Sequence, residues 1–184
     1  MFHDLLATQN KALVLQFYKS FDNRRLSEAL TLLSPDLIAH MSGMDEPLGL
    51  AAFDRIGTEV YNAFPDGRHE FSQVIAHRDT VTTCGFFIGT HLGPFQGLPP
   101  TGKVIRFAVM HLDRVSYGKI IEHWGQGDRL SLVQQLGVKL VPGPGVLLKL
   151  GLKASRHLQQ ETFARLRAIA QPDYPSQTQT RNRS

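Results

Sequence analysis

Apolar residues in the first third of the chain recur at three- and four-residue intervals, the spacing that lets one face of a helix be buried. This spacing predicts helices over residues 8–22, 26–33 and 50–64. Thr8 is expected to cap the first helix, and the turn-forming residues 65–67 end the third. The apolar positions of the two longer helices are Leu13, Val14, Phe17, Tyr18, Phe21, Phe53, Ile56, Val60 and Phe64.

After residue 67 the pattern changes to alternating or continuously apolar runs rich in β-branched and aromatic residues, which are typical of strands. Besides a short extended segment at 37–41, these runs predict strands over 68–77, 81–91, 103–115 and 120–125. A loop dense in Gly and Pro follows at 92–102, and a last short helix is expected from Asp128 to Leu136. Short turns join the strands, so antiparallel pairing is favoured.

The order of these elements predicts an α+β fold, in which three N-terminal helices cover one face of a curved antiparallel sheet. Such a sheet, closed by helices, leaves a conical hollow. A hollow of this kind is the default place for a small ligand. We therefore expect one domain over residues 1–137 with a ligand pocket between helices and sheet.

Charge divides the chain near residue 137. Residues 1–137 carry 12 Lys and Arg against 14 Asp and Glu, whereas residues 138–184 carry 8 against 2, so the net charge of +4 originates in the C-terminal part. Residues 138–170 are expected to form a basic helical extension, and residues 171–184 a disordered tail. The basic segment 146–170 can pack on the domain or contact an anionic membrane surface, and packing is favoured.

Several classes of function lack support. The domain is not basic and carries no nucleic-acid-binding motif, so no nucleic-acid partner is expected. The single cysteine, Cys84, excludes an intramolecular disulfide and is expected to be a small buried residue. The sequence lacks zinc-site spacing, a nucleotide-binding glycine motif and a serine-hydrolase motif, so no metal and no cofactor are expected. With neither a signal peptide nor a long apolar run, we expect a cytoplasmic protein.

Three stretches carry a family resemblance: "NKALVLQFYKSFDNRRLSEALTLLSPDLIAH", "GTHLGPFQGLPPTGK" and "GKIIEHWGQGDRLSLVQQLG". Together they resemble the SnoaL-like polyketide cyclases of the NTF2-like superfamily, from about residue 10 to residue 137. The resemblance implies a cone-shaped α+β barrel, a homodimer formed through the outer face of the sheet, and cofactor-free acid/base chemistry. In that chemistry an aspartate abstracts a proton and a polyketide ring closes by intramolecular aldol condensation.

Asp128 is the catalytic base that the resemblance implies, because it lies four residues after Trp124, where the SnoaL-like cyclases carry their catalytic aspartate. A dry apolar wall would raise the pKa of this carboxyl from its reference value of ~3.9 toward the working pH. Asp is also a favoured N-cap, and the segment that follows is expected to be helical, so a capping role stays open.

His111 and His123 are the candidate partners of that base. Alternation along the strand places His111 on the same apolar face as Phe107, where an imidazole either packs in the core or donates a hydrogen bond to an enolate oxygen. His123 and Trp124 are neighbours on a strand, so only one of them faces the pocket. We favour Trp124 as the inward residue.

Further pocket residues are expected on other elements. His40 ends a segment at the cavity mouth, His91 precedes the Gly/Pro loop at the rim, and Phe17 and Phe107 lie on inward faces. The remaining histidines are expected at the surface; they are His3, His69, His77 and His157.

These features predict a cofactor-independent enzyme that acts on a small apolar carbonyl compound, in a polyketide cyclase-like aldol cyclisation or an isomerisation. The alternative is a non-catalytic small-ligand-binding or dimeric assembly module, since fold does not fix function. Epoxide hydrolysis needs two carboxylates and an arginine around one water; it is less favoured, because Asp113 and Arg114 are neighbours on a strand and face opposite sides.

Overall fold

The structure, a computed structural model, describes residues 2–139. The extension predicted at 138–170 and the tail predicted at 171–184 therefore lie outside the described residues, apart from Val138 and Lys139. The described helices and strands are, in chain order, α1 (Phe2–Asp22), α2 (Leu26–Thr31), β1 (Leu33–Met41), α3 (Leu50–Ala63), β2 (Arg68–His77), β3 (Thr80–Thr90), β4 (Val104–Ser116), β5 (Lys119–Gly127) and α4 (Arg129–Leu136). None of the described helices is long and apolar enough to cross a membrane.

The five strands form one sheet in the order β1-β5-β4-β3-β2. The β2–β3, β3–β4 and β4–β5 pairs are antiparallel, as predicted. The β1–β5 pair is parallel, so the sheet is mixed and the prediction of a wholly antiparallel sheet is wrong at this edge. Short turns dictate antiparallel pairing only between strands that follow one another, and β1 and β5 are far apart in sequence.

The first helix begins earlier than the sequence pattern predicts. It starts at Phe2, and Thr8 lies inside it, where the hydroxyl donates to the carbonyl of Asp4 at 2.8 Å. Thr8 is therefore not an N-cap. A Thr side chain that bonds the carbonyl four residues earlier is compatible with a helix interior, so a good capping residue does not by itself mark a helix start.

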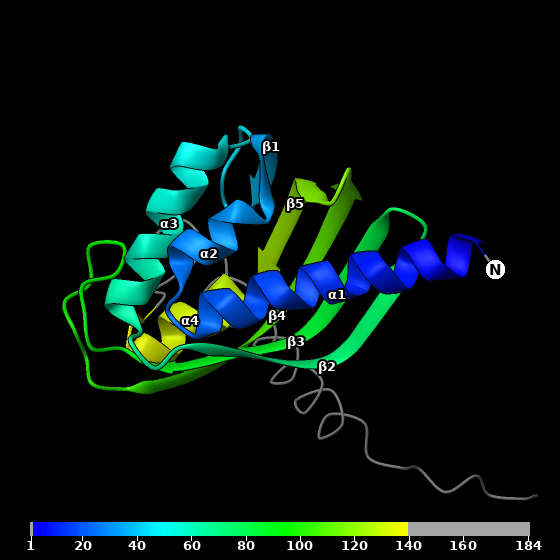
Figure 1. The fold of residues 1–184 in the computed structure, drawn as a ribbon. Helices are drawn as coiled ribbons and strands as arrows, with labels where there is room; N and C mark the ends of the chain where they lie inside the picture. Colours follow the sequence, from blue (N-terminus) through cyan, green and yellow to red (C-terminus); the bar gives the residue numbers. More distant parts are fainter. Residues whose placement is uncertain (1, 140–184) are drawn as a thin grey trace, which may run out of the picture. The chain divides into compact units, whose positions relative to one another are not determined.

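The helices cover the inner face of the sheet, and the core lies between the two layers (Figure 1). Helix α1 packs against β2 and β3, α3 packs against β1, and α4 packs against β4. The apolar stripe of α1 is buried as predicted, with Val14, Phe17 and Tyr18 at most 4% exposed. A second cluster forms around Phe64, Phe87 and the inward residues of β4.

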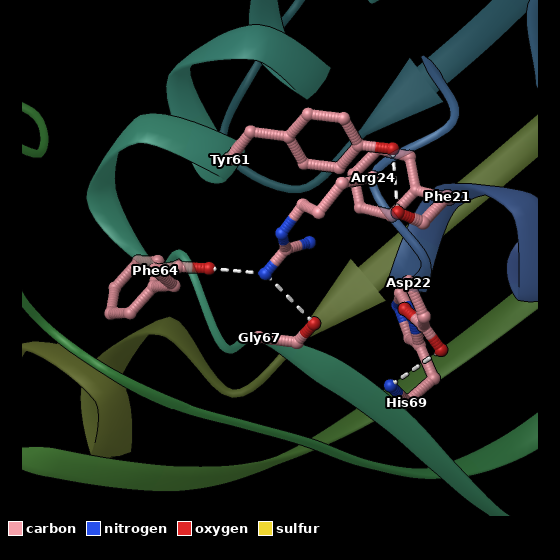
Figure 2. A network of polar contacts seen from close by, with 7 residues as sticks. All are labelled: Phe21, Asp22, Arg24, Tyr61, Phe64, Gly67 and His69. Atoms are coloured by element: carbon pink, nitrogen blue, oxygen red, sulfur yellow. Dashed lines mark hydrogen bonds and ion pairs between the residues drawn. The ribbon is translucent and has the colours of Figure 1, made fainter.

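Arg24 ties the end of α1 to the turn between α3 and β2 (Figure 2). Its guanidinium donates to the carbonyls of Phe64, Pro65 and Gly67 at 2.5–3.0 Å and lies over the ring of Tyr61. These bonds satisfy backbone acceptors that no helix or strand uses, and they fix where α1 ends relative to β2.

Candidate functional site

A cavity of about 230 Å³ lies between the helices and the inner face of the sheet. Its wall is mainly apolar and rich in aromatic rings, which gives a ligand an apolar surface to pack against. The phenylalanines that line it are Phe17, Phe21, Phe53, Phe64, Phe87, Phe95 and Phe107. Tyr18, His69, His111 and His123 supply polar groups to the same wall.

His123 and Asp113 form a buried acid–histidine pair in this wall. The two residues lie directly opposite each other in the β4–β5 ladder, so both side chains face inward. Nδ1 of His123 lies 2.8 Å from Oδ1 of Asp113, and the two side chains are 4% and 0% exposed. A carboxylate can only accept here, so Nδ1 carries the hydrogen and Nε2 of the neutral ring is left as an acceptor.

Tyr18 holds the other oxygen of the same carboxylate. Its hydroxyl donates to Oδ2 of Asp113 at 3.1 Å. Burial, and next the nearby charge of Asp113, raise the pKa of Tyr18 well above its ordinary value, so the phenol stays protonated as a donor. Asp113 thus has both oxygens engaged and keeps the His123 ring in a fixed orientation.

Gly125 leaves Nε2 of His123 uncovered. A Cβ built at this inward position would lie 2.9 Å from Nε2 and 3.0 Å from the sulfur of Met41. Any side chain there would press on the one ring nitrogen that Asp113 does not hold. The absence of a side chain at this position therefore matters to the chemistry of the site.

His111 is the neighbour of His123 in the wall, with ring centroids 5.5 Å apart. Neither of its ring nitrogens has a hydrogen-bond partner within residues 2–139, although both are buried. Burial, followed by the charges of His123 and His69, lowers the pKa of His111 well below 6.5, so the ring is neutral at physiological pH. A neutral imidazole without partners can donate to one ligand oxygen and accept from another group.

His69 on β2 and Asp22 at the end of α1 form a second acid–histidine pair (Figure 2). Nδ1 of His69 lies 2.8 Å from Oδ1 of Asp22, and the backbone N–H of His69 donates to Oδ2 at 3.0 Å. The imidazole is only 9% exposed and its ring lies 5.5 Å from that of His111. The prediction that His69 is a surface residue is wrong.

The exposed residues that line the cavity include Glu59, Gln96 and Arg129, and these mark its mouth. Arg129 donates to the carbonyl of Ser42 at 2.6 Å and to the side chain of Gln96 at 2.9 Å. The backbone N–H of Gln96 donates to Glu59 at 3.0 Å. These bonds join β1, α3, α4 and the Gly/Pro loop around one opening.

Trp124 faces away from the cavity, contrary to our preferred interpretation. It is 41% exposed, its indole N–H donates to Glu122 and its ring stacks on His40 with centroids 3.7 Å apart. In the β4–β5 ladder His123 lies opposite the inward-facing Asp113, so the side chain of His123 faces inward. Its neighbour Trp124 must therefore point outward. Neither Trp124 nor His40 lines the cavity.

The structure distributes the other predicted site residues between cavity, core and surface. Phe17 and Phe107 line the cavity, whereas His91 is fully buried behind it, against Phe64 and hydrogen-bonded to Thr101. Asp128 is exposed and lies outside the cavity lining; its carboxylate accepts from the backbone N–H of Ser131 at 2.9 Å and caps α4. Of the three predicted catalytic side chains, the cavity contains His111 and His123 but not Asp128.

The chain is similar to one protein family and to several proteins of known structure. The family model described as SnoaL-like polyketide cyclase matches residues 12–136. AclR from Streptomyces galilaeus, provisionally assigned as a hydroxylase, is 28% identical with a TM-score of 0.69 over 85% of this chain and 98% of its own. IdmH from Streptomyces antibioticus, provisionally assigned as a polyketide cyclase, is 27% identical with a TM-score of 0.63 over 71% of this chain and 99% of its own.

A SnoaL-like protein from Jannaschia sp. CCS1 is 19% identical with a TM-score of 0.67, over 73% of this chain and 96% of its own. At that identity the likeness concerns the fold alone. The sequence matches none of the curated proteins with which it was compared.

Proposed function

The chain belongs to the SnoaL-like polyketide cyclase family, and from this premise we propose that it is an acid/base enzyme acting on a small apolar carbonyl compound. The observation that carries the proposal is the buried His123–Asp113 pair beside His111, whose ring nitrogens lack partners, in an aromatic cavity. Side chains with these properties are what proton abstraction next to a carbonyl group requires.

His123 is the general base of the proposal. Its Nε2 takes a proton from the carbon next to the carbonyl, and the C–H electron pair moves into the enolate. Asp113 touches no substrate; it positions the ring and balances the positive charge that the ring acquires, while Tyr18 fixes Asp113 in turn. Gly125 gives the substrate carbon access to Nε2.

His111 stabilises the enolate. As a neutral ring it donates one N–H to the oxygen on which negative charge develops, and the apolar surroundings strengthen that bond because little water competes with it. The pKa of His111, lowered by burial and then by the neighbouring histidines, suits this role because a neutral donor does not give up its proton to the enolate.

Ring closure by an intramolecular aldol reaction is the reaction we propose to follow. The enolate carbon attacks a second carbonyl of the same molecule, and the resulting alkoxide takes up a proton. The reaction consists of proton transfers between the substrate and the chain's own side chains and one carbon–carbon bond formation within the substrate, so the proposal includes no cofactor. The similarity to IdmH, provisionally assigned as a polyketide cyclase, supports this choice of substrate class.

The test measures proton abstraction directly, without a known natural substrate. The protein is incubated in D₂O with 2-tetralone, an apolar bicyclic ketone, and loss of the α-proton signal is followed by NMR. We expect catalysed exchange in the wild type and a reduction of roughly 10²–10⁴-fold in H123Q and D113N, the usual contribution of a general base.

H77Q is the matched control, because His77 is exposed at the end of β2 and outside the cavity. It should exchange at the wild-type rate, and calorimetry should show that H123Q still binds 2-tetralone. Exchange at the wild-type rate in H123Q would contradict the proposal. A wild-type protein that binds the ketone without exchanging its protons would instead favour the ligand-binding alternative.

A further inference from the structure

The pair formed by His69 and Asp22 is not used by the chemistry proposed above. His69 lies on β2 and His123 on β5, which are separated by β3 and β4 in the sheet, and His111 lies beside both rings. Each pair binds Nδ1 of its histidine to a carboxylate. Within residues 2–139, Nε2 of His69 has no hydrogen-bond partner, and the side chain lines the cavity.

Asp22 connects this pair to solvent on the other side of the wall. A groove between α1 and β2 is lined by Asp22, and also by His69 and Tyr18, which line the cavity as well. His69 and Tyr18 therefore separate cavity from groove. The carboxylate of Asp22 is 19% exposed, so water can reach it while the imidazole ring bonded to it remains almost fully buried.

We propose that His69 is the general acid of the same cavity and that water in the groove, which His69 also lines, resupplies its proton. This inference rests on the proposed function, because it assigns the second proton transfer of that reaction. A donor fed from the groove can be reprotonated without exchange of water through the mouth of the cavity.

The protons balance over one turnover. His123 gains one proton at Nε2 from the substrate carbon and releases it to water once product leaves. His69 loses one proton from Nε2 to the alkoxide, forming the O–H bond, and regains one from groove water. Asp22 is a positioning residue here: it holds Nδ1 and balances the charge of the protonated ring.

The experiment uses α-deuterated 2-tetralone in H₂O. This ketone has no second carbonyl and forms no alkoxide, so here the general acid, His69, protonates the enolate that His123 has formed and supplies a proton in place of the deuteron removed. We expect H69Q and D22N to slow deuterium loss roughly tenfold at low buffer concentration. Imidazole added as buffer should restore the rate, because a small acid that enters the cavity replaces the missing donor. A merely structural defect would not respond to buffer.

D66N is the matched control, because Asp66 lines the same groove but bonds Thr90 and not His69. It should keep the wild-type rate and show no dependence on imidazole.

The outcomes separate this inference from the function on which it rests. Wild-type rates in H69Q at low buffer, with H123Q inactive, would overturn the donor role of His69 and leave the proposed function standing. A slow H69Q that imidazole does not restore would also overturn it. Wild-type rates in H123Q, or no exchange by the wild type, would overturn the proposed function itself.

Discussion

At the scale of single residues, the three cavity histidines differ in what holds their ring nitrogens. His69 and His123 each have Nδ1 fixed by a carboxylate, whereas His111 has neither nitrogen engaged within the described part of the chain. A fixed Nδ1 leaves one defined nitrogen for proton transfer. A ring without partners is suited instead to binding a ligand, because no existing hydrogen bond has to be broken before the ligand binds.

His111 should make stability depend on pH. Its pKa is lowered in the folded protein, chiefly by burial, so the unfolded chain binds this proton more readily. The protein should therefore lose stability as the pH falls below 6.5, the ordinary pKa of histidine, by up to about 1.4 kcal/mol per pH unit. Above pH 6.5 the titration of His111 should cause no loss of stability. Urea unfolding at pH 7.5 and 5.5 measures this, and H111Q should show a smaller difference than H77Q.

Gly125 should be intolerant of even one added carbon. In G125A the new Cβ meets Nε2 of His123 at 2.9 Å, so the ring must shift or lose its access to substrate. We expect proton abstraction from 2-tetralone to fall at least tenfold, with stability reduced by about 1–3 kcal/mol from overpacking. G49A is the control, since a Cβ there meets nothing within 4 Å; equal activity in both variants would argue against the role of Gly125.

Part of the site follows from the sequence. Alternation along β4 places Phe107 and His111 inward, and it puts Asp113, two residues later, on the same inward face. The choice between His123 and Trp124 depends on which residue of β4 lies opposite, and alternation within one strand cannot supply that register. The surface position predicted for His69 is wrong because Asp22 compensates the burial of its imidazole ring.

At the scale of elements, the sequence predicts most boundaries because turn residues mark them. β2 has the predicted limits, and the other strands and helices after residue 22 differ from prediction by a few residues. The parallel β1–β5 pair could not be predicted from pattern, because periodicity describes which face a residue occupies and not which strand lies beside it.

Asp128 should act on helix α4 and not on the chemistry. D128A removes the hydrogen bond to the backbone N–H of Ser131 and should cost about 0.5–2 kcal/mol of stability, while D128S should retain most of it. Both should exchange the α-protons of 2-tetralone at the wild-type rate. A loss of exchange in D128S, with stability unchanged, would return Asp128 to the catalytic role that the resemblance implies.

Arg24 should matter more to stability than its exposed neighbour Arg25, the N-cap residue of α2. R24Q loses the bonds that join the end of α1 to the α3–β2 turn, and we expect a cost of about 2–4 kcal/mol in urea unfolding. R25Q breaks only an exposed ion pair with Glu28 and should cost about 0.5 kcal/mol or less. Similar costs for both would show that the Arg24 bonds are replaced by water.

At the scale of the whole molecule, the outer face of the sheet exposes large apolar side chains. Ile38, Ile75, Met110 and Trp124 are 41–61% exposed. Apolar patches of this kind mark association surfaces, so the homodimer that the resemblance implies stays a prediction for this face. Light scattering after gel filtration should give a dimer for the wild type and L130E, which changes α4, and a monomer for M110E. A monomeric wild-type protein would contradict the prediction of a homodimer.

The parallel β1–β5 pair sets a constraint on synthesis. Among the strands within residues 2–139, β1 (residues 33–41) has β5 (residues 119–127) as its one sheet neighbour. The nascent chain therefore carries β1 without its partner strand until translation passes Gly127. His123 lies on β5 as well, so it joins the cavity lining only when this strand has been added to the sheet. A chain that stops short of residue 119 therefore exposes a template for aggregation, and it also lacks His123, the proposed base.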